Sequence, residues 1–551
     1  MHRPGCWLLA MLLLIQLLLC MSPQLMPSCS LVCRVDQTDS CHLLQLPDPC
    51  LLAVMQCCAD DPRSLFSAAR AHSRLHQAAV LPLRSMTATV NHETVASAVS
   101  YLTSHGQHIE DLDMMSKGNR CHQWYSVVLF ELPNNMSKLT SLQLAGMSLQ
   151  LLHGRFFQGV LAAGPPLKQL QLHRCKLCDH RDALAAALLV LPTLQRLSIR
   201  AHEAYQPFNL SSDVAQVLRQ LTFLELSGRF ATAGLQHLPG LTSLQDLRLW
   251  TDATITASML SDLQLTHLEL YGAHRVCVLT PGSKFEPDAL AGKAQLRHVV
   301  LRSCRIPDGS AGVQLLLSHL QLLQQLTYLD LSQTLAHTAP AAAYAVLTAS
   351  SKLRHLDVSR SQLPVGVWQH MFPSGRQLPY LRQLDIGSIH HPNGAAAVAP
   401  EGSRLVSCCP ELHSLHMQAL LYSSQRLAGL PGLSSLQQLS LRPCNRSAEG
   451  LEVVCQLTGL RELIVTDPTT AEGLLLQLTQ LRQLMRLLFS GTLNGVGWIK
   501  HYKVEVCMLH SLACPISVTR AIVSSCYTMA PVLCVTMLCQ VICDRPLPWL
   551  S

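Results

Sequence analysis

The amino-acid sequence predicts an α/β solenoid shaped as a horseshoe, with a parallel sheet on the concave face and helices on the convex face. The first observation behind this prediction is a motif, L-x-x-L-x-L, that recurs along the chain. Three consecutive copies start at Leu326, Leu353 and Leu381, which lie 27 and 28 residues apart. The second observation is the composition, which is 49% hydrophobic and only 14% charged. An average domain is about 25% charged, so each repeat is expected to insert several leucines into a shared core.

This motif and period are those of a leucine-rich repeat. The repeats are expected to fill 83–495, beginning with two weaker copies at Leu83 and Ile109. The clear copies start at Leu139, Leu167, Leu194, Leu221, Leu244, Leu265, Leu296, Leu326, Leu353, Leu381, Leu412, Leu436, Leu460 and Leu484. Each motif predicts a short strand with its leucines turned inward. Segments 213–220, 313–326 and 341–347 are apolar at helical spacing, so helical returns between strands are expected.

The chain begins with a segment, 1–30, that has the form of a secretory signal. His2 and Arg3 precede an apolar run from Trp7 to Cys20, which is too short for an ordinary membrane span. A wrong initiation site is the competing interpretation, and the sequence leaves both open.

A short all-α region is expected at 46–80, before the repeats. A helix with paired leucines, an acidic turn and a second amphipathic helix follow one another there. The residues that carry this pattern are Leu46, Pro47, Leu51, Leu52 and Leu65. The pattern resembles the F-box, and its position before leucine-rich repeats is similar to that in the substrate receptors of cullin–RING ubiquitin ligases. The resemblance implies that these five residues bind the adaptor subunit of the ligase. A plain helical cap of the solenoid is the alternative.

The chain changes character near its end, in the Cys-rich apolar tail 498–551, where no repeat is legible. Residues 521–543 form a run of 23 residues without a charge, which is long enough to cross a membrane. Pro531 and several polar residues interrupt that run. The sequence leaves three interpretations open: an unstructured or capping tail, a membrane segment, or a mispredicted end of the coding region.

The 23 cysteines show no regular disulfide framework, since eight lie in the first 58 residues and six in the last 45. Cys175, Cys304 and Cys444 occupy the repeat position at which leucine-rich repeats place an inward Asn or Cys. These three are therefore expected to be buried, reduced and structural.

The outward side chains of the strands predict a binding face, because the third, fifth and seventh positions of each motif point away from the leucine core. Aromatic and charged residues gather there between residues 250 and 385, and protein-binding hot spots favour these types. The predicted target-binding residues are Trp250, Tyr271, Arg302, Tyr328, Asp330, His355, Asp357, Arg382 and Asp385. The three aspartates would lie about 4.8 Å apart on neighbouring strands, so their repulsion requires a compensating group. An ordinary solvated face is the alternative.

The sequence contains no catalytic motif such as H-E-x-x-H, G-x-S-x-G or a P-loop lysine, so the protein is predicted not to be an enzyme. Cys175 and Cys178 have the spacing of metal ligands, but Cys175 is expected to point into the core. Neither a metal nor another cofactor is expected. The formal net charge of +7 comes without a long basic run, so no nucleic-acid partner is predicted.

Three functional hypotheses follow. In the first, the protein is a cytoplasmic or nuclear substrate receptor that acts as a monomer within a complex with the ligase adaptor and a target protein. In the second, it is a secreted or membrane-anchored recognition protein that uses 1–30 and 521–543. In the third, it is a cytoskeletal or ciliary scaffold without an enzyme partner. We prefer the first, because the pattern at 46–80 continues directly into the repeats whereas the apolar start is separate from them.

Overall fold

The computed structural model of the 551-residue chain describes residues between 84 and 505. The gaps in this stretch are residues 92, 117–128, 131, 134, 150–166, 178–182, 201–209, 228–231, 273–282, 390–399, 420–426, 444–452, 467–480, 482 and 493–498. The described chain divides into two compact units, one up to Leu244 and one from Gln245 onward.

Several predictions concern residues outside the described part of the chain. They are the signal-like segment 1–30, the F-box-like region 46–80 and the apolar run 521–543. The adaptor-binding residues predicted there are Leu46, Pro47, Leu51, Leu52 and Leu65. These interpretations stay predictions.

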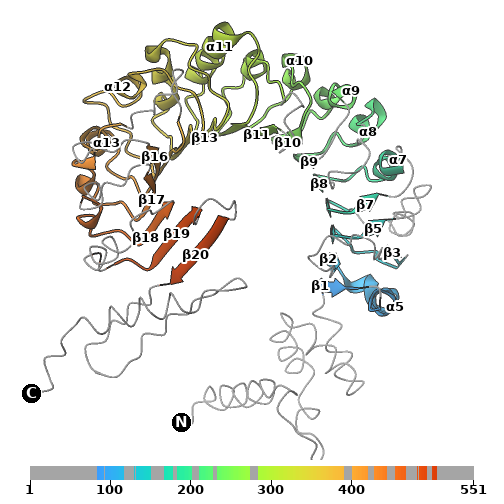
Figure 1. Cartoon of the computed structure of the whole chain (residues 1–551). Helices are drawn as coiled ribbons and strands as arrows, with labels where there is room; N and C mark the ends of the chain where they lie inside the picture. Colours follow the sequence, from blue (N-terminus) through green and yellow to red (C-terminus); the bar gives the residue numbers. More distant parts are fainter. Residues whose placement is uncertain are drawn as a thin grey trace, which may run out of the picture. The chain divides into compact units, whose positions relative to one another are not determined.

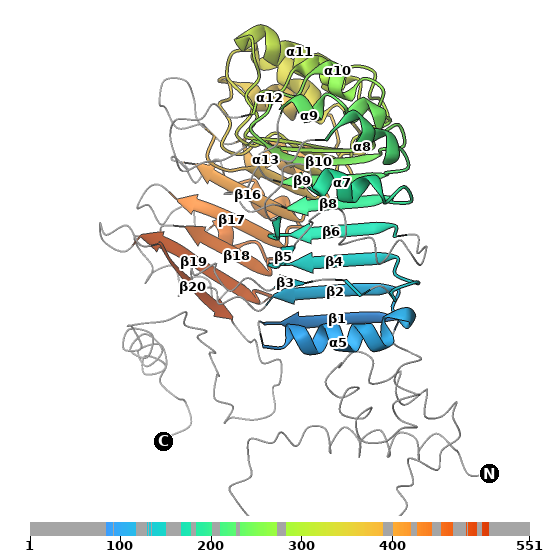
Figure 2. The ribbon, with the colours of Figure 1, turned by 90° about the vertical axis from the view of Figure 1, so that its right-hand side faces the viewer.

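Parallel strands form the first unit's main sheet, in which each strand pairs with the next repeat's strand (Figure 2). These strands are β1 (Ser85–Val90), β2 (Asp111–Ser116), β4 (Ser141–Ala145), β6 (Gln169–His173), β8 (Arg196–Arg200) and β9 (Phe223–Ser227). A second, small sheet holds β3 (Leu129–Phe130), β5 (Ser148–Leu149) and β7 (Lys176–Leu177). The helices are α5 (Val95–His105), η3 (Gly106–His108), α7 (Ala183–Leu189), α8 (Ser212–Val217), α9 (Thr232–Leu235) and η5 (Leu238–Gly240).

The second unit repeats this plan. Its parallel strands are β10 (Asp246–Thr251), β11 (His267–Gly272), β12 (His298–Arg302), β13 (Tyr328–Asp330), β14 (His355–Asp357), β15 (Gln383–Ile386), β16 (Ser414–Ala419), β17 (Gln438–Pro443), β18 (Glu462–Thr466) and β19 (Arg486–Thr492). Its helices are α10 (Ala257–Leu260), η6 (Pro287–Leu290), α11 (Gly309–Gln321), η7 (Ala341–Thr348), α12 (Val367–Met371), α13 (Gly402–Cys408) and η8 (Leu430–Gly432). Helices α10 to α13 lie on the outer side of these repeats and the strands on the inner side (Figure 1).

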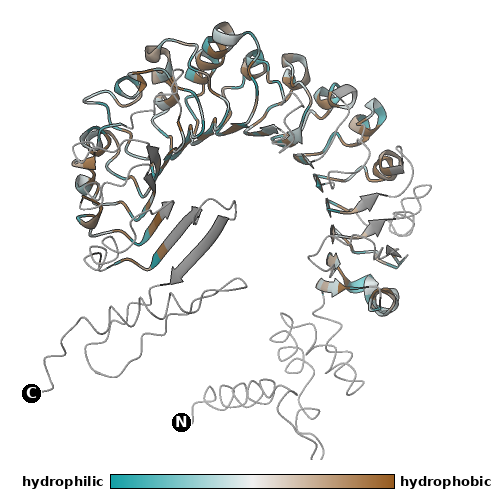
Figure 3. Ribbon diagram, viewed as in Figure 1, coloured by the Kyte–Doolittle hydropathy of each residue, from teal (hydrophilic) through white to brown (hydrophobic). Residues whose placement is uncertain are grey.

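The repeat motif fixes where each strand begins. Every one of the predicted clear repeat starts is followed two residues later by the first residue of a strand, which confirms the predicted register. The inward positions are buried, as Leu353 (1% exposed), Leu356 (0%) and Val358 (0%) illustrate. Burying one such side chain contributes about 1.5–3 kcal/mol, so every repeat adds its own share of core. Apolar and polar residues therefore alternate around each repeat instead of gathering in one segment (Figure 3).

A ladder of small polar side chains connects neighbouring repeats through hydrogen bonds at the turn after several strands. At the ninth position, counted from the first leucine of the repeat, a thiol or hydroxyl donates a hydrogen bond to a backbone carbonyl of the preceding repeat. This bond satisfies a buried acceptor. The pairs are Cys175 with Leu144, Cys304 with Leu270, Thr334 with Leu301 and Ser361 with Leu331. Cys175 and Cys304 are buried and free, as predicted, and Cys444 lies outside the described residues.

The returns between strands differ from the prediction in detail. The helix expected at 213–220 is α8, which ends at Val217, and the helix expected at 313–326 is α11, which begins earlier, at Gly309. The segment at 341–347 forms a 3-10 helix, η7, instead of an α-helix. Apolar spacing over two turns does not distinguish these two helices, because both bury one side.

The end of the second unit adds a strand that the repeat motif does not predict. β20 (Ile499–Glu505) pairs antiparallel with β19. Strand formation at this point shows that regular structure extends into the segment in which no repeat is legible. Among the helices within the described residues, none combines the length and the apolar character that crossing a membrane requires.

Candidate functional site

The outward side chains of β10 to β16 in the second unit form the candidate site, which we call the strand face. The parallel register aligns their third motif positions into one column, which runs through His267, His298, Tyr328, His355 and Gln383. The fifth and seventh positions form two further columns beside it. The sequence predicts these columns, and the structure shows which of their members interact.

The third column is a stack of rings. His298 and Tyr328 lie 4.1 Å apart between ring centroids, and Tyr328 and His355 lie 4.0 Å apart with only 4° between the ring planes. His267 continues the stack at 5.4 Å from His298. Burial lowers the pKa of both His267 and His355, which favours neutral imidazoles in the stack. Such aromatic pairs contribute about 0.5–1.5 kcal/mol each beyond the area that they bury.

His355 marks the end of this stack. Its Nδ1 lies 2.7 Å from the side-chain Oε1 of Gln383. A carbonyl oxygen only accepts, so Nδ1 carries the proton of the neutral ring and Nε2 is left as an acceptor. That Nε2 atom is buried and has no hydrogen-bond partner among the described residues.

A second aromatic pair lies in the seventh column. The rings of Trp250 and Tyr271 stack at 4.4 Å with 3° between their planes. The guanidinium of Arg302, on the next strand, lies 5.8 Å from the centroid of the Tyr271 ring, within the range of a cation–π contact. The Tyr271 hydroxyl donates a hydrogen bond of 3.0 Å to Glu269. Burial, followed by the charge of Glu269, raises the pKa of Tyr271, so this hydroxyl keeps its proton at neutral pH.

Glu269 connects the two aromatic groups. Its carboxylate lies 3.2 Å from Nε2 of His298 and 3.6 Å from Nη1 of Arg248, and it also accepts from Tyr271. Burial alone would raise the pKa of Glu269. The hydrogen bonds from His298 and Tyr271 and the charge of Arg248 outweigh burial and lower the pKa, so the carboxylate is ionised.

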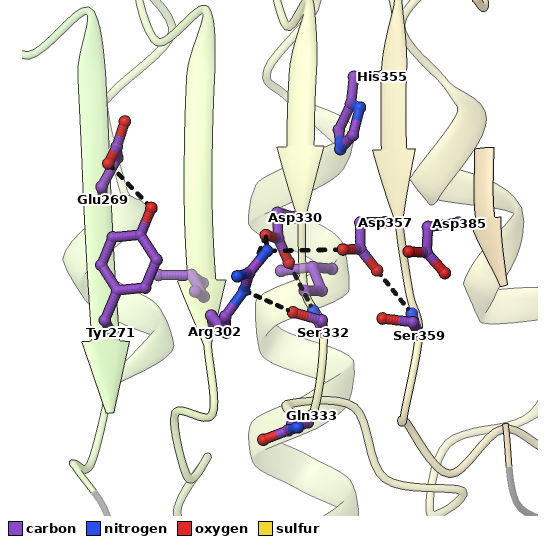
Figure 4. A network of polar contacts seen from close by, with 12 residues as sticks. Glu269, Tyr271, Arg302, Asp330, Ser332, Gln333, His355, Asp357, Ser359 and Asp385 are labelled. Atoms are coloured by element: carbon purple, nitrogen blue, oxygen red, sulfur yellow. Dashed lines mark hydrogen bonds and ion pairs between the residues drawn. The ribbon is translucent and has the colours of Figure 1, made fainter. Parts of the chain in front are cut away.

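Arg302 forms an ion pair with Asp330, the first of the three aspartates (Figure 4). Its Nη2 and Nε lie 2.6 Å and 3.2 Å from Oδ2 of Asp330, and Nε also donates to Oγ of Ser332. The backbone N–H of Ser332 donates to the other carboxylate oxygen at 2.9 Å. Asp330 is only 1% exposed, whereas the Arg302 side chain is 46% exposed. A buried carboxylate therefore fixes a cation at the surface.

Asp357, on the following strand, lacks so close a cation. Arg302 approaches it only to 3.7 Å, and the backbone N–H of Ser359 donates to it at 2.8 Å. Burial, followed by the charges of Asp385 and Asp330, raises the pKa of Asp357 to about 7. The predicted repulsion among the three carboxylates is thus relieved by one arginine and by partial protonation of the central aspartate.

Asp385 completes the row and is less buried than the other two. It accepts from the backbone N–H of Gly387 at 2.9 Å and lies 3.4 Å from Nδ1 of His416. Glycine at position 387 permits this approach, because a Cβ there would lie 2.9 Å from the His416 ring.

The predicted target-binding residues therefore fall into two groups. The first group is buried: Asp330 and Asp357 are 1% and 6% exposed and lie beside the guanidinium of Arg302. The second group reaches the surface and includes Arg382, which is exposed. The others are partly exposed or, like Arg302, exposed. They are Trp250, Tyr271, Arg302, Tyr328, His355 and Asp385. The prediction leaves out Glu269, His298 and Gln383, and the signal that identifies them is their position in the same columns.

The first unit contains a smaller polar network. The Ser198 hydroxyl donates to Glu225 at 2.6 Å, and Nε of Arg200 donates to the same carboxylate at 2.8 Å. His173 lies 3.3 Å from Ser198. The Ser198 hydroxyl donates its one proton to Glu225, so toward the imidazole of His173 it accepts a hydrogen bond. In the described part of the chain, no group of three or more His, Cys, Asp or Glu residues is placed to hold a metal ion.

Comparison with known proteins finds similarity at the level of structure. No protein-family model matches the chain, and no curated protein matches it in sequence. A solved structure that it resembles is an internalin from Listeria monocytogenes, at 15% sequence identity and a TM-score of 0.41. That match covers 72% of this chain and 92% of the internalin.

The stacked repeats and their outward strand face define the class of this protein. It is a leucine-rich-repeat solenoid, because the strands of successive L-x-x-L-x-L repeats pair in parallel and in one register.

Proposed function

We propose that this protein is the target-recognition subunit of a cullin–RING ubiquitin ligase, which binds a target protein through the strand face and the ligase adaptor through 46–80. In this proposal it acts in the cytoplasm or nucleus as a monomer within that complex. It performs no chemistry itself. It raises the effective concentration of target lysines near the conjugating enzyme.

The observation that carries target binding is the half-exposed cluster of Trp250, Tyr271 and Arg302. Trp, Tyr and Arg are the residue types most enriched in protein-binding hot spots. The ring stack and the buried Asp330 fix these side chains before a partner arrives. A partner then loses less side-chain entropy on binding, because these side chains are already ordered.

The ligase part of the proposal rests on the sequence of 46–80. Paired leucines at Leu51 and Leu52 and the proline at Pro47 support it, together with the position of this region before the repeats. In this proposal, 46–80 binds the ligase adaptor and the repeats bind the target protein.

Affinity capture tests both parts at once. The tagged full-length chain is expressed in cytosol, and the proteins that bind it are compared with those bound by two double variants. Leu51→Asp with Leu52→Asp disrupts the predicted adaptor contact, and Trp250→Ala with Tyr271→Ala disrupts the strand face. Leu322→Ala is the matched control, because this leucine is 62% exposed and follows helix α11, away from the strand face.

We expect the wild type and the control to capture an adaptor, a cullin and a target protein. The first double variant should lose the adaptor and cullin but keep the target, and the second should do the reverse. Capture of neither adaptor nor cullin by the wild type refutes the ligase proposal. Entry of the full-length chain into the secretory pathway, with glycans at Asn135, Asn209 or Asn445, supports the extracellular hypothesis instead.

A further inference from the structure

The positive and negative side chains of the strand face differ in their exposure to solvent. The side chains of Glu269, Asp330 and Asp357 are at most 9% exposed, and that of Asp385 is 26% exposed. The side chain of Arg302, by contrast, is 46% exposed. A partner that approaches this face therefore meets cations before carboxylates.

A second row of side chains, which contains three arginines, lies where the strands begin. The residue before each member of the ring column occupies the second motif position, and directly before β12 to β16 this row consists of Arg297, Thr327, Arg354, Arg382 and His413. Backbone hydrogen bonds join each member to the next. The N–H of Thr327 donates to Arg297 at 2.8 Å, that of Arg354 to Thr327 at 2.8 Å, and that of Arg382 to Arg354 at 2.9 Å.

The arginines of this row are exposed and, within the described part of the chain, their side chains lack a partner. Arg297, Arg354 and Arg382 form no side-chain hydrogen bond or ion pair with any described residue. Arg354 and Arg382 lie on adjacent strands, about 4.8 Å apart, so their like charges repel. Lys352, just before this row, is also exposed. Nothing within the described chain neutralises this concentration of positive charge.

We infer that the target protein presents an acidic, extended segment, whose carboxylates bind Arg297, Arg354 and Arg382 across the starts of β12 to β15. This inference rests on the proposed function and specifies the chemistry of its partner. Arginine suits the role, because its planar fork binds carboxylates through two parallel hydrogen bonds. Tyr380, which is 54% exposed and directly precedes the repeat start at Leu381, offers an aromatic contact beside the row.

The dimensions of the row define the length of the segment. Three inter-strand spacings separate Arg297 from Arg382, which amounts to about 14 Å. An extended chain covers about 3.3–3.6 Å per residue, so roughly four residues cross the row. Glu411, which is exposed one position before the next repeat start at Leu412, limits the row on that side because it repels an acidic partner.

Fluorescence anisotropy with the full-length protein tests this inference. The probe is a fluorescein-labelled oligoglutamate peptide, compared with oligolysine and with single-stranded oligothymidine of similar length. The test variant is Arg354→Gln with Arg382→Gln. The matched control is Arg219→Gln with Arg305→Gln, which removes the same charge from two exposed arginines outside the row.

We expect oligoglutamate to bind, oligolysine not to bind, and the test variant to lower the affinity for oligoglutamate about tenfold, as the loss of two exposed charge contacts predicts. The control should bind like the wild type, and raising the salt from about 50 to about 200 mM should weaken binding. The inference is overturned if oligoglutamate fails to bind or binds the test variant equally well. It is also overturned if oligothymidine binds more tightly than oligoglutamate and depends on the same arginines, because the row then selects nucleic acid.

Failure of this inference is distinguishable from failure of the proposed function. If capture of a target protein depends on Trp250 and Tyr271 but oligoglutamate binding does not depend on the arginines, the proposed function stands and the acidic segment is refuted. If the arginine variant loses oligoglutamate while the Trp250→Ala, Tyr271→Ala variant retains every captured protein, the basic row binds acidic chains and the aromatic cluster is not the target site.

Discussion

Replacing Asp357 by asparagine should make the second unit more stable at neutral and alkaline pH. The carboxyl group of Asp357 is buried beside Asp330 and Asp385, and Arg302 directs its shortest contact, of 2.6 Å, to Asp330. Asparagine has nearly the same shape and keeps an oxygen that can accept the hydrogen bond from the backbone N–H of Ser359. The substitution therefore removes a buried negative charge and little else.

The magnitude follows from the pKa of Asp357, which is raised from 3.8 to about 7. One pKa unit corresponds to about 1.4 kcal/mol, so ionising this group in the folded protein costs about 4 kcal/mol. In the unfolded chain the group ionises above about pH 4, whereas in the folded protein it ionises only near pH 7. The stability that its neutral form contributes is fully present below about pH 4 and is lost as the pH rises through 7. The stability of the Asp357→Asn variant relative to the wild type should therefore increase by roughly 2–3 kcal/mol as the pH rises from 5 to 8.

Denaturant unfolding under reducing conditions measures this difference. Tryptophan fluorescence follows unfolding at several pH values from 5 to 8, and the variant is compared with the wild type at each pH. The comparison removes the contribution of the titrating groups that lie far from Asp357, because those groups are the same in both proteins. Asp252→Asn, which removes one charge from an exposed aspartate, is the matched control.

A stability difference that stays constant between pH 5 and pH 8 would refute the reasoning. A variant less stable than the wild type at pH 8 would do so more directly. That result would mean that Arg302, at 3.7 Å, forms a stabilising ion pair with Asp357 and outweighs both burial and the neighbouring carboxylates.

Two further substitutions test the contacts beneath the strand face. Arg302→Met should destabilise the second unit by roughly 2–4 kcal/mol, because it leaves the buried carboxylate of Asp330 without its cation. Thermal or denaturant unfolding measures the loss. Thr334→Val should destabilise it by about 1–3 kcal/mol, because its hydroxyl donates to the carbonyl of Leu301 and accepts from the N–H of Cys304, and both groups are buried. The same unfolding experiment applies.

Each of these predictions has its own control. Adding Asp330→Asn to Arg302→Met should restore most of the lost stability, since the unpaired charge is then absent. If the double variant is less stable than the single one, the ion pair is not the cause of the loss. Thr338→Val changes an exposed threonine and should leave stability within about 0.5 kcal/mol of the wild type. An equal loss at both threonines would show that the ladder hydrogen bonds contribute nothing specific.

The positions of the strands and of the core leucines were predictable from the sequence because a solenoid is built from local units. Each repeat contacts mainly its neighbours, so one motif with a fixed period determines both the register and the inward positions. The outward columns follow from the same alternation, and they contain Trp250, Tyr271 and the three aspartates. The helix type of the returns was less predictable, as the 3-10 helix η7 shows.

The partners within the strand face were not predictable from the columns. Arg302, at a seventh motif position, reaches Asp330 at a fifth position of the next strand, and His298, at a third position, reaches Glu269 at a fifth. These diagonal contacts depend on which side chains are short and which are long. On β12, which lies between the strands of Glu269 and Asp330, the fifth position holds Val300, a small apolar residue.

The sequence by itself determined the repeat, the strand starts, the buried leucines and the identity of the outward residues. These depend on periodicity alone, which a linear sequence carries completely. Only the tertiary structure decided that Asp330 and Asp357 are buried, that Arg302 and the arginines at the strand starts are exposed, and that β20 pairs antiparallel with β19. The physical reason is that burial and charge pairing depend on distances of a few ångströms between side chains of different repeats, which no spacing along the chain encodes.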